Sequence, residues 1–162
     1  MENKLITGMK WTAWGIAAAS LVWFLVAQLW LKSPIGMHFD SEGNFDVIDS
    51  KFYGFYPHGI NLLCIGLTVL FDVLAEKVRI GLKVTEYGEE LLRKVMHISI
   101  GWGRLLIVIF FSYWNALVIL QKPLSEQVPT AILSMLMLGF NATIIAFIII
   151  RYRVAGKGKA DA

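Results

Sequence analysis

The feature that most constrains this chain is a set of four apolar stretches, each about twenty residues long and almost free of charge. They cover residues 11–31, 59–75, 98–120 and 130–150. The hydrocarbon core of a bilayer is about 30 Å thick, and a helix needs about 20 apolar residues to cross it. The sequence therefore predicts an all-α integral membrane protein, a four-transmembrane-helix bundle that forms one membrane domain over residues 1–162.

The composition also favours a membrane domain over a soluble one. Hydrophobic residues make up 57% of the chain and charged residues only 17%, whereas soluble domains carry about 25% charged residues. Lys4 and Lys10 precede the first stretch, as in a signal peptide. That stretch is longer than the apolar region of about 7–15 residues in signal peptides, and no cleavage site follows it. We therefore expect it to remain in the mature protein as a helix.

The distribution of lysine and arginine predicts the orientation in the membrane. Two precede the first stretch, five lie in residues 76–97 and four follow the last stretch, whereas residues 32–58 and 121–129 hold two and one. Basic residues concentrate on the cytoplasmic side of membrane proteins. We therefore predict a multi-pass protein of the cell membrane with both termini in the cytoplasm. Since the basic residues are explained by topology, nucleic acid is not an expected partner.

The outer loop, residues 32–58, is too long to be a simple connector between two helices. It concentrates four carboxylates, and its Glu42-Gly43-Asn44 sequence is typical of a turn in which glycine takes a positive φ. Apolar and aromatic residues alternate with the acids: Met37, Phe39, Phe45, Val47 and Ile48. This pattern predicts an ordered loop that folds back onto the membrane surface or onto the helix ends.

The order of several residues in this loop resembles a known membrane module. The matching positions are Pro34, His38-Phe39-Asp40, Gly43, Asp46, Ser50-Lys51 and Pro57. They are similar to the signature of domain of unknown function 1648, which forms the N-terminal part of the SdpI-like membrane proteins. The resemblance covers residues 10–75. It implies immunity or signalling towards a secreted peptide toxin, with Pro34, His38, Phe39, Asp40, Gly43, Asp46 and Lys51 as candidate residues for contacting a peptide or a membrane partner.

A metal site in the outer loop is an alternative interpretation. Oxygen-rich loops suit Ca²⁺ or Mg²⁺, and the candidate ligands are His38, Asp40, Asp46 and Asp49, with His58 able to complete the set if the loop folds over it. Apart from His58, at the end of the loop, no second histidine or EF-hand-like ligand array accompanies them. We therefore favour capping and hydrogen bonding that order the loop, and predict neither a metal nor another cofactor.

Two charges inside the apolar stretches predict an ion pair. Asp72 lies about 6 Å and Arg104 about 10 Å from the cytoplasmic ends of their helices, at 1.5 Å per residue. The two helices run in opposite directions, so the charges fall at similar depths. An unpaired charge at that depth costs several kcal/mol. We predict a salt bridge that fixes the helix pair; a role in ion or substrate passage is the alternative.

Polar residues also occur in the outer half of the predicted bundle. Gln28, Asn61 and Asn115 could together line a polar funnel open to the outside. Each alone could instead form an interhelical hydrogen bond worth about 1 kcal/mol. Asn141, near the middle of the fourth stretch, indicates a partner helix at that level.

No enzyme motif is present: the chain has no Gly-rich phosphate loop, no His-Glu-x-x-His zinc sequence and no Gly-x-Ser-x-Gly elbow. The favoured hypothesis is a non-enzymatic binding, sensing or immunity-type protein, embedded in the lipid bilayer, whose outer loop recognises a secreted peptide or another membrane protein. The alternative is a subunit of a small transporter or pore that works as a homo-oligomer, since four helices alone form only a narrow path.

Overall fold

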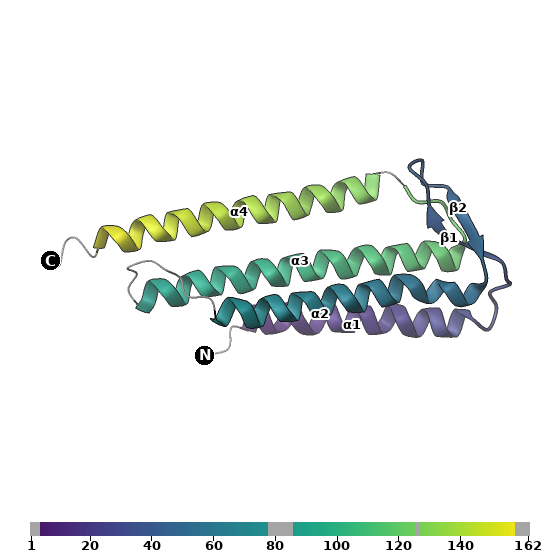
Figure 1. The fold of residues 1–162 in the computed structure, drawn as a ribbon, viewed down its shortest axis with the longest axis horizontal. Helices are drawn as coiled ribbons and strands as arrows, with labels where there is room; N and C mark the ends of the chain where they lie inside the picture. Colours follow the sequence, from purple (N-terminus) through teal and green to yellow (C-terminus); the bar gives the residue numbers. More distant parts are fainter. Residues whose placement is uncertain (1–3, 78–85, 126, 158–162) are drawn as a thin grey trace.

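A computed structural model describes residues 4–77, 86–125 and 127–157 of the 162-residue chain. Figure 1 shows long helices lying side by side, with a small hairpin at one end. In chain order the elements are α1 (Lys4–Ala27), β1 (Ile35–Phe39), β2 (Phe45–Asp49), the 3-10 helix η1 (Lys51–Phe55), α2 (Tyr56–Lys77), α3 (Glu86–Leu120) and α4 (Gln127–Lys157). The predicted all-α class is confirmed by the four long helices, and the outer loop adds one small two-stranded antiparallel sheet.

Four helices in the structure are long and apolar enough to cross a membrane, as predicted. The first ends at Ala27 rather than at residue 31. The third apolar stretch, residues 98–120, is the second part of one continuous helix that begins at Glu86, as the charge spacing of residues 86–97 predicts. The first residue of α1 and the last turn of α4 lie at one end of the bundle (Figure 1), which we name the termini end; the sheet marks the opposite, hairpin end.

α3 is the central element of the bundle, because it packs against α1, α2, α4 and β1. Two apolar clusters fill the space around it. The cluster nearer the middle consists of Ala13, Ala17, Ile65 and Val108, and the cluster at the hairpin end of Phe24, Ala27, Leu31, Ile35, Val118 and Ile119. The alanines of α1 permit close approach of the helix backbones, as small residues do in membrane bundles.

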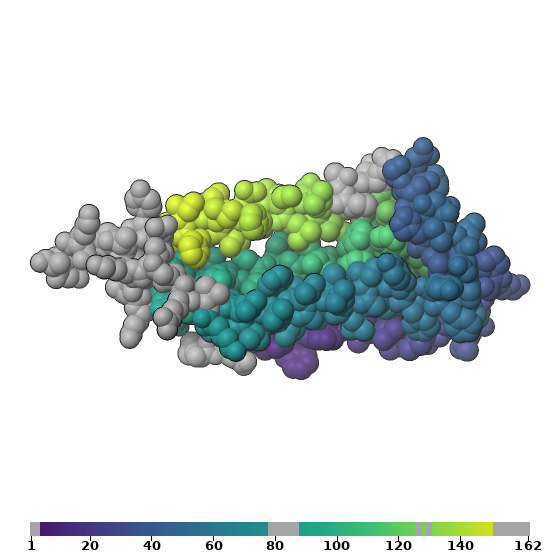
Figure 2. All heavy atoms as spheres, viewed as in Figure 1, coloured from purple at the N-terminus to yellow at the C-terminus, as the bar shows by residue number. Residues whose placement is uncertain are grey.

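α4 is attached chiefly to α3, and none of its most apolar 18 residues is buried. Openings between α4 and α3 are visible in Figure 2. An apolar groove of about 570 Å³ runs between α1, α3 and α4. Ser99 and Thr143 join α3 to α4 through a hydroxyl–hydroxyl contact of 2.5 Å. Asn141 donates to the Met137 carbonyl oxygen of its own helix at 2.8 Å, so the predicted partner helix does not engage it within the described chain.

The hairpin packs through aromatic side chains onto the end of α3. Phe39 is 6% exposed and stacks on Phe45 with ring centroids 4.6 Å apart. Its other neighbour is the Trp114 ring of α3, at 5.4 Å. A Cβ at Gly36 would lie 2.3 Å from the Phe45 ring, so only glycine fits in β1 at that position. These contacts bury one face of the short sheet and leave β2 largely exposed.

Candidate functional site

Side chains of α3 and of the residue following it hold the backbone of β1. The Trp114 indole donates to the Met37 carbonyl oxygen at 3.0 Å. The Gln121 carboxamide bonds Gly36 in both directions: Oε1 accepts from the Gly36 amide at 2.9 Å and Nε2 donates to its carbonyl oxygen at 3.3 Å. A two-stranded sheet is only marginally stable by itself in water. These bonds therefore fix the hairpin to the end of α3 and stabilise it there.

The turn of the hairpin is ordered by Asp40 and Gly43. The Asp40 carboxylate accepts hydrogen bonds from the Glu42 and Asn44 amides at 2.8 and 2.9 Å. Gly43 has a φ of +83°, as its position in the predicted turn requires, and its carbonyl oxygen accepts from the Leu124 amide at 2.8 Å. Asp40 thus has the capping role that the sequence favoured over metal ligation.

His38 and Asp46 meet across the hairpin on its exposed side. Their side chains are 55% and 41% exposed, and Nδ1 of His38 lies 2.7 Å from a carboxylate oxygen of Asp46. The strand pairing shifts register on both sides of His38. Among the residues that the structure describes, no three His, Cys, Asp or Glu side chains are grouped closely enough to hold a metal ion.

Lys51 binds the turn that follows α1. Its ammonium group donates to the Gln28 and Leu31 carbonyl oxygens at 2.8 and 3.1 Å. Backbone carbonyl groups that leave a helix need a hydrogen-bond donor from elsewhere. Lys51 supplies that donor, which explains a lysine at this point of the outer loop. Pro34 is exposed in the turn that joins α1 to β1, after a cis peptide bond.

Replacing Lys51 with methionine should lower the free energy of unfolding by about 1–2 kcal/mol, because two charge-assisted hydrogen bonds to the turn after α1 are lost. Denaturant titration of the purified protein in detergent micelles measures the change. Lys32→Met is the matched control, since Lys32 is exposed on the turn after α1. Equal stability of the two variants would contradict this role for Lys51.

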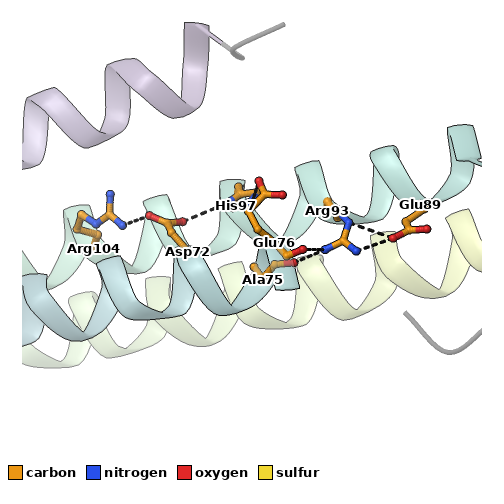
Figure 3. Close-up of polar contacts among 7 residues, drawn as sticks. All are labelled: Asp72, Ala75, Glu76, Glu89, Arg93, His97 and Arg104. Atoms are coloured by element: carbon orange, nitrogen blue, oxygen red, sulfur yellow. Dashed lines mark hydrogen bonds and ion pairs between the residues drawn. The ribbon is translucent and has the colours of Figure 1, made fainter. Parts of the chain in front are cut away.

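A second polar cluster lies between α2 and α3 towards the termini end (Figure 3). The predicted ion pair of Asp72 and Arg104 is present, with an Arg104 side chain only 2% exposed. Arg104 Nε also donates to the Thr68 hydroxyl at 2.8 Å, and Nη2 to the Thr68 carbonyl oxygen at 3.2 Å. Such multiple bonding is what a buried charge requires to remain inside a bundle.

The ion pair continues into contacts of His97 and Arg93 with α2 that the sequence analysis missed. His97 Nδ1 lies 3.0 Å from Asp72 Oδ1, and His97 Nε2 lies 2.8 Å from Glu76 Oε1. Arg93 donates to the Ala75 carbonyl oxygen at 2.5 Å and to that of Glu76 at 2.7 Å. Its guanidinium also pairs with Glu89 one turn away. The spacing of residues 93, 97 and 104 could have indicated these contacts, because the three positions share one face of a helix.

The polar residues nearer the hairpin end are buried and do not form an open funnel. Asn115 is 0% and Asn61 3% exposed. The Asn115 amide donates to the Ser20 carbonyl oxygen at 3.2 Å and to its hydroxyl at 3.1 Å, which is the predicted interhelical alternative. Both side-chain polar atoms of Gln28 are buried and form no hydrogen bond with a described protein group.

Comparison of the chain with protein-family models, curated proteins and solved structures gives no match. The resemblance to domain of unknown function 1648 and the SdpI-like proteins therefore stays a prediction.

Proposed function

We propose that the protein is a binding or sensing protein of the cell membrane whose hairpin recognises an extended, basic segment of a secreted peptide or membrane partner. The observation that carries this proposal is the exposed strand β2. Residues 46–49 are all exposed, in a hairpin fixed to α3 and α1. The positive-inside pattern supports placing this end outside the cell, with both termini in the cytoplasm.

The backbone of β2 offers the first element of recognition. An extended peptide can add to an unpaired strand edge, with main-chain hydrogen bonds supplying affinity and alternate side chains supplying specificity. Among the described residues, β2 pairs with β1 alone. Since Trp114 and Gln121 already hold the hairpin in place, binding requires little further ordering of the protein.

The side chains of β2 define the chemistry of the partner. Val47 and Ile48 are 43% and 65% exposed and offer apolar contact. Asp46 and Asp49, on either side of them, are also exposed and favour lysine or arginine on the partner. Exposed aromatic residues follow in η1 and at the start of α2, namely Phe52, Tyr53 and Tyr56. Such residues anchor proteins at the membrane–water interface, so a peptide on β2 would lie along the membrane surface.

Photocrosslinking from position 48 in native membranes tests this function. A photoreactive residue in place of Ile48 should capture a polypeptide, and mass spectrometry should locate the crosslink in a segment rich in lysine or arginine. The combined Asp46→Asn and Asp49→Asn substitution should reduce capture about tenfold, which corresponds to about 1.4 kcal/mol.

The same probe at Leu133, which is 56% exposed on α4, is the matched control. Identical products from positions 48 and 133, or capture that is independent of Asp46 and Asp49, would overturn the proposal. The amount of the doubly substituted protein in the same membrane sample is measured, so that reduced capture is not mistaken for a lower amount of protein.

A further inference from the structure

The face that α2 turns towards α3 is polar along most of its length. Its positions recur every three or four residues, the spacing of one helix face. From the hairpin end they are His58, Asn61, Ile65, Thr68, Asp72 and Ala75, all buried except the partly buried Asp72. Helix faces packed inside a membrane bundle are normally rich in small and apolar residues. A face with four polar positions out of six calls for a functional explanation.

α3 presents polar groups opposite this face in the same order. Near the hairpin end, Asn115 of α3 is buried, as are His58 and Asn61 of α2. Further along, Arg104 bonds Asp72, and His97 follows with its own contact to Asp72. We call this line of facing groups the α2–α3 seam.

One apolar layer interrupts the α2–α3 seam. Ile65 and Val108, 1% and 0% exposed, meet there, and Ala13 and Ala17 of α1 complete the cluster. We call these four residues the apolar plug. The polar positions of α2 on either side of the plug are seven residues apart, about 10 Å along the helix. Apolar constrictions of this kind close channels by excluding water.

We propose that the α2–α3 seam is a proton path and that the apolar plug holds it closed in this conformation. This activity goes beyond peptide recognition and does not depend on it. The transported species is the proton, because the groups along the seam are histidines, carboxylates, hydroxyls and carboxamides, which can exchange protons through hydrogen bonds, directly or through water.

Proton transfer at the termini end follows from the geometry of His97. Each of its two ring nitrogens lies within hydrogen-bonding distance of a carboxylate oxygen, Asp72 on one side and Glu76 on the other. A hydrogen bond between a ring nitrogen and a carboxylate oxygen needs one proton between the two atoms. His97, Asp72 and Glu76 therefore share two protons. When Glu76 gives its proton to Nε2 and Nδ1 gives its proton to Asp72, one proton has moved from Glu76 to Asp72 and the ring is neutral again.

The exposure of Glu76 and Asp72 indicates where protons enter the path and which way they move along it. The Glu76 side chain is 64% exposed at the termini end, whereas that of Asp72 is 24% exposed. Protonation of Asp72 neutralises the carboxylate that holds Arg104, whose guanidinium keeps its own proton. Arrival of a proton therefore weakens the ion pair one turn away from Val108 of the plug.

Beyond the plug, buried polar atoms continue the seam towards the hairpin end. His58 Nε2, Asn61 Oδ1 and Asn115 Oδ1 are buried and form no hydrogen bond with a described protein group. A buried polar atom without a partner costs about 1–3 kcal/mol, so ordered water normally satisfies it. Water between these atoms would carry protons from the plug to the hairpin end.

Proton flux into liposomes tests the path. The full-length protein is reconstituted with a pH-sensitive dye inside, and an external acid pulse is applied together with a potassium diffusion potential set by valinomycin. The wild-type protein should conduct slowly. Ile65→Ser should raise the proton flux about tenfold or more by hydrating the plug. Adding His97→Phe to that variant should return the flux to the wild-type level.

Leu63→Ser is the matched control, because Leu63 lies on the same helix and is 64% exposed. Val108→Thr, which nearly preserves shape, is the second opening variant if Ile65→Ser does not fold. The proposal is overturned if neither folded variant conducts more than Leu63→Ser. It is also overturned if the increased flux is indifferent to His97, since the variant would then be a simple leak.

Discussion

Replacing Asp72 with asparagine should destabilise the bundle by about 3–5 kcal/mol, the usual cost of leaving one member of a buried ion pair unpaired. Arg104 is 2% exposed, so water cannot compensate for the lost carboxylate. Its remaining described bonds go to the neutral Thr68. Denaturant titration of the purified protein in detergent micelles gives the free energy of unfolding.

Two further variants separate the ion pair from the rest of the cluster. Glu76→Gln changes a carboxylate that contacts the same histidine but is 64% exposed, and should cost less than about 1 kcal/mol. Asp72→Asn combined with Arg104→Gln removes both charges and should recover most of the lost stability. A double variant no more stable than Asp72→Asn alone would show that the pair is not the source of the effect.

Replacing Gly43 with alanine should detach the hairpin turn and lower the free energy of unfolding by about 2–3 kcal/mol. A Cβ there would lie 2.0 Å from the Leu124 carbonyl oxygen, and the φ of +83° is unfavourable for any residue with a side chain. The hydrogen bond from the Leu124 amide to Gly43 would be lost when the turn moves away. Limited proteolysis should then cut the hairpin much faster than in the wild-type protein.

Gly59→Ala provides the comparison for this substitution. Nothing lies within 4 Å of a Cβ at Gly59, and alanine is favoured over glycine inside a helix. The control should therefore be as stable as the wild type or more so. If Gly43→Ala resists proteolysis as well as Gly59→Ala does, the turn is not held in the way described.

The four helices, the ion pair and the turn could be predicted, because each depends on one simple quantity: the length of an apolar stretch, the depth of a charge or the φ of a glycine. Hydropathy alone indicated the four apolar helices, since a bilayer requires their length. Counting residues from the helix ends placed Asp72 and Arg104 at similar depths, and the ion pair is present. The turn at Gly43 followed from local chemistry, because glycine takes positive φ at little cost.

The β-hairpin was harder to predict, because its strands are five residues each and their pairing shifts register beside His38. Its stability comes from Trp114 and Gln121, which are 77 and 85 residues away from their partners in the sequence. The sequence suggested an ordered loop there, yet it gave no sign of which helix would hold it.

The contacts of Lys51 with the turn after α1, and of Arg93 and His97 with α2, were missed for a related reason. Each side chain bonds carbonyl oxygens or carboxylates of a segment distant in the sequence, so its role depends on how the helices pack. Residue type and spacing show only that such a side chain lies on a particular face. Whether the outer loop residues bind a peptide stays a prediction, although the structure shows that Phe39, Asp40, Gly43 and Lys51 are engaged within the protein itself.

α3 contacts both the hairpin and the polar cluster that contains Arg104 and His97, so it connects these two parts of the bundle mechanically. Its 35 residues form one helix about 52 Å long. Trp114 and Gln121 bind the hairpin at one end of α3. Arg104 and His97 bind α2 further along the same helix. A helix is stiff along its axis, so a load on the hairpin that shifts or turns α3 must also displace the His97 and Arg104 contacts. Occupancy on one side of the membrane would thereby be converted into motion on the other.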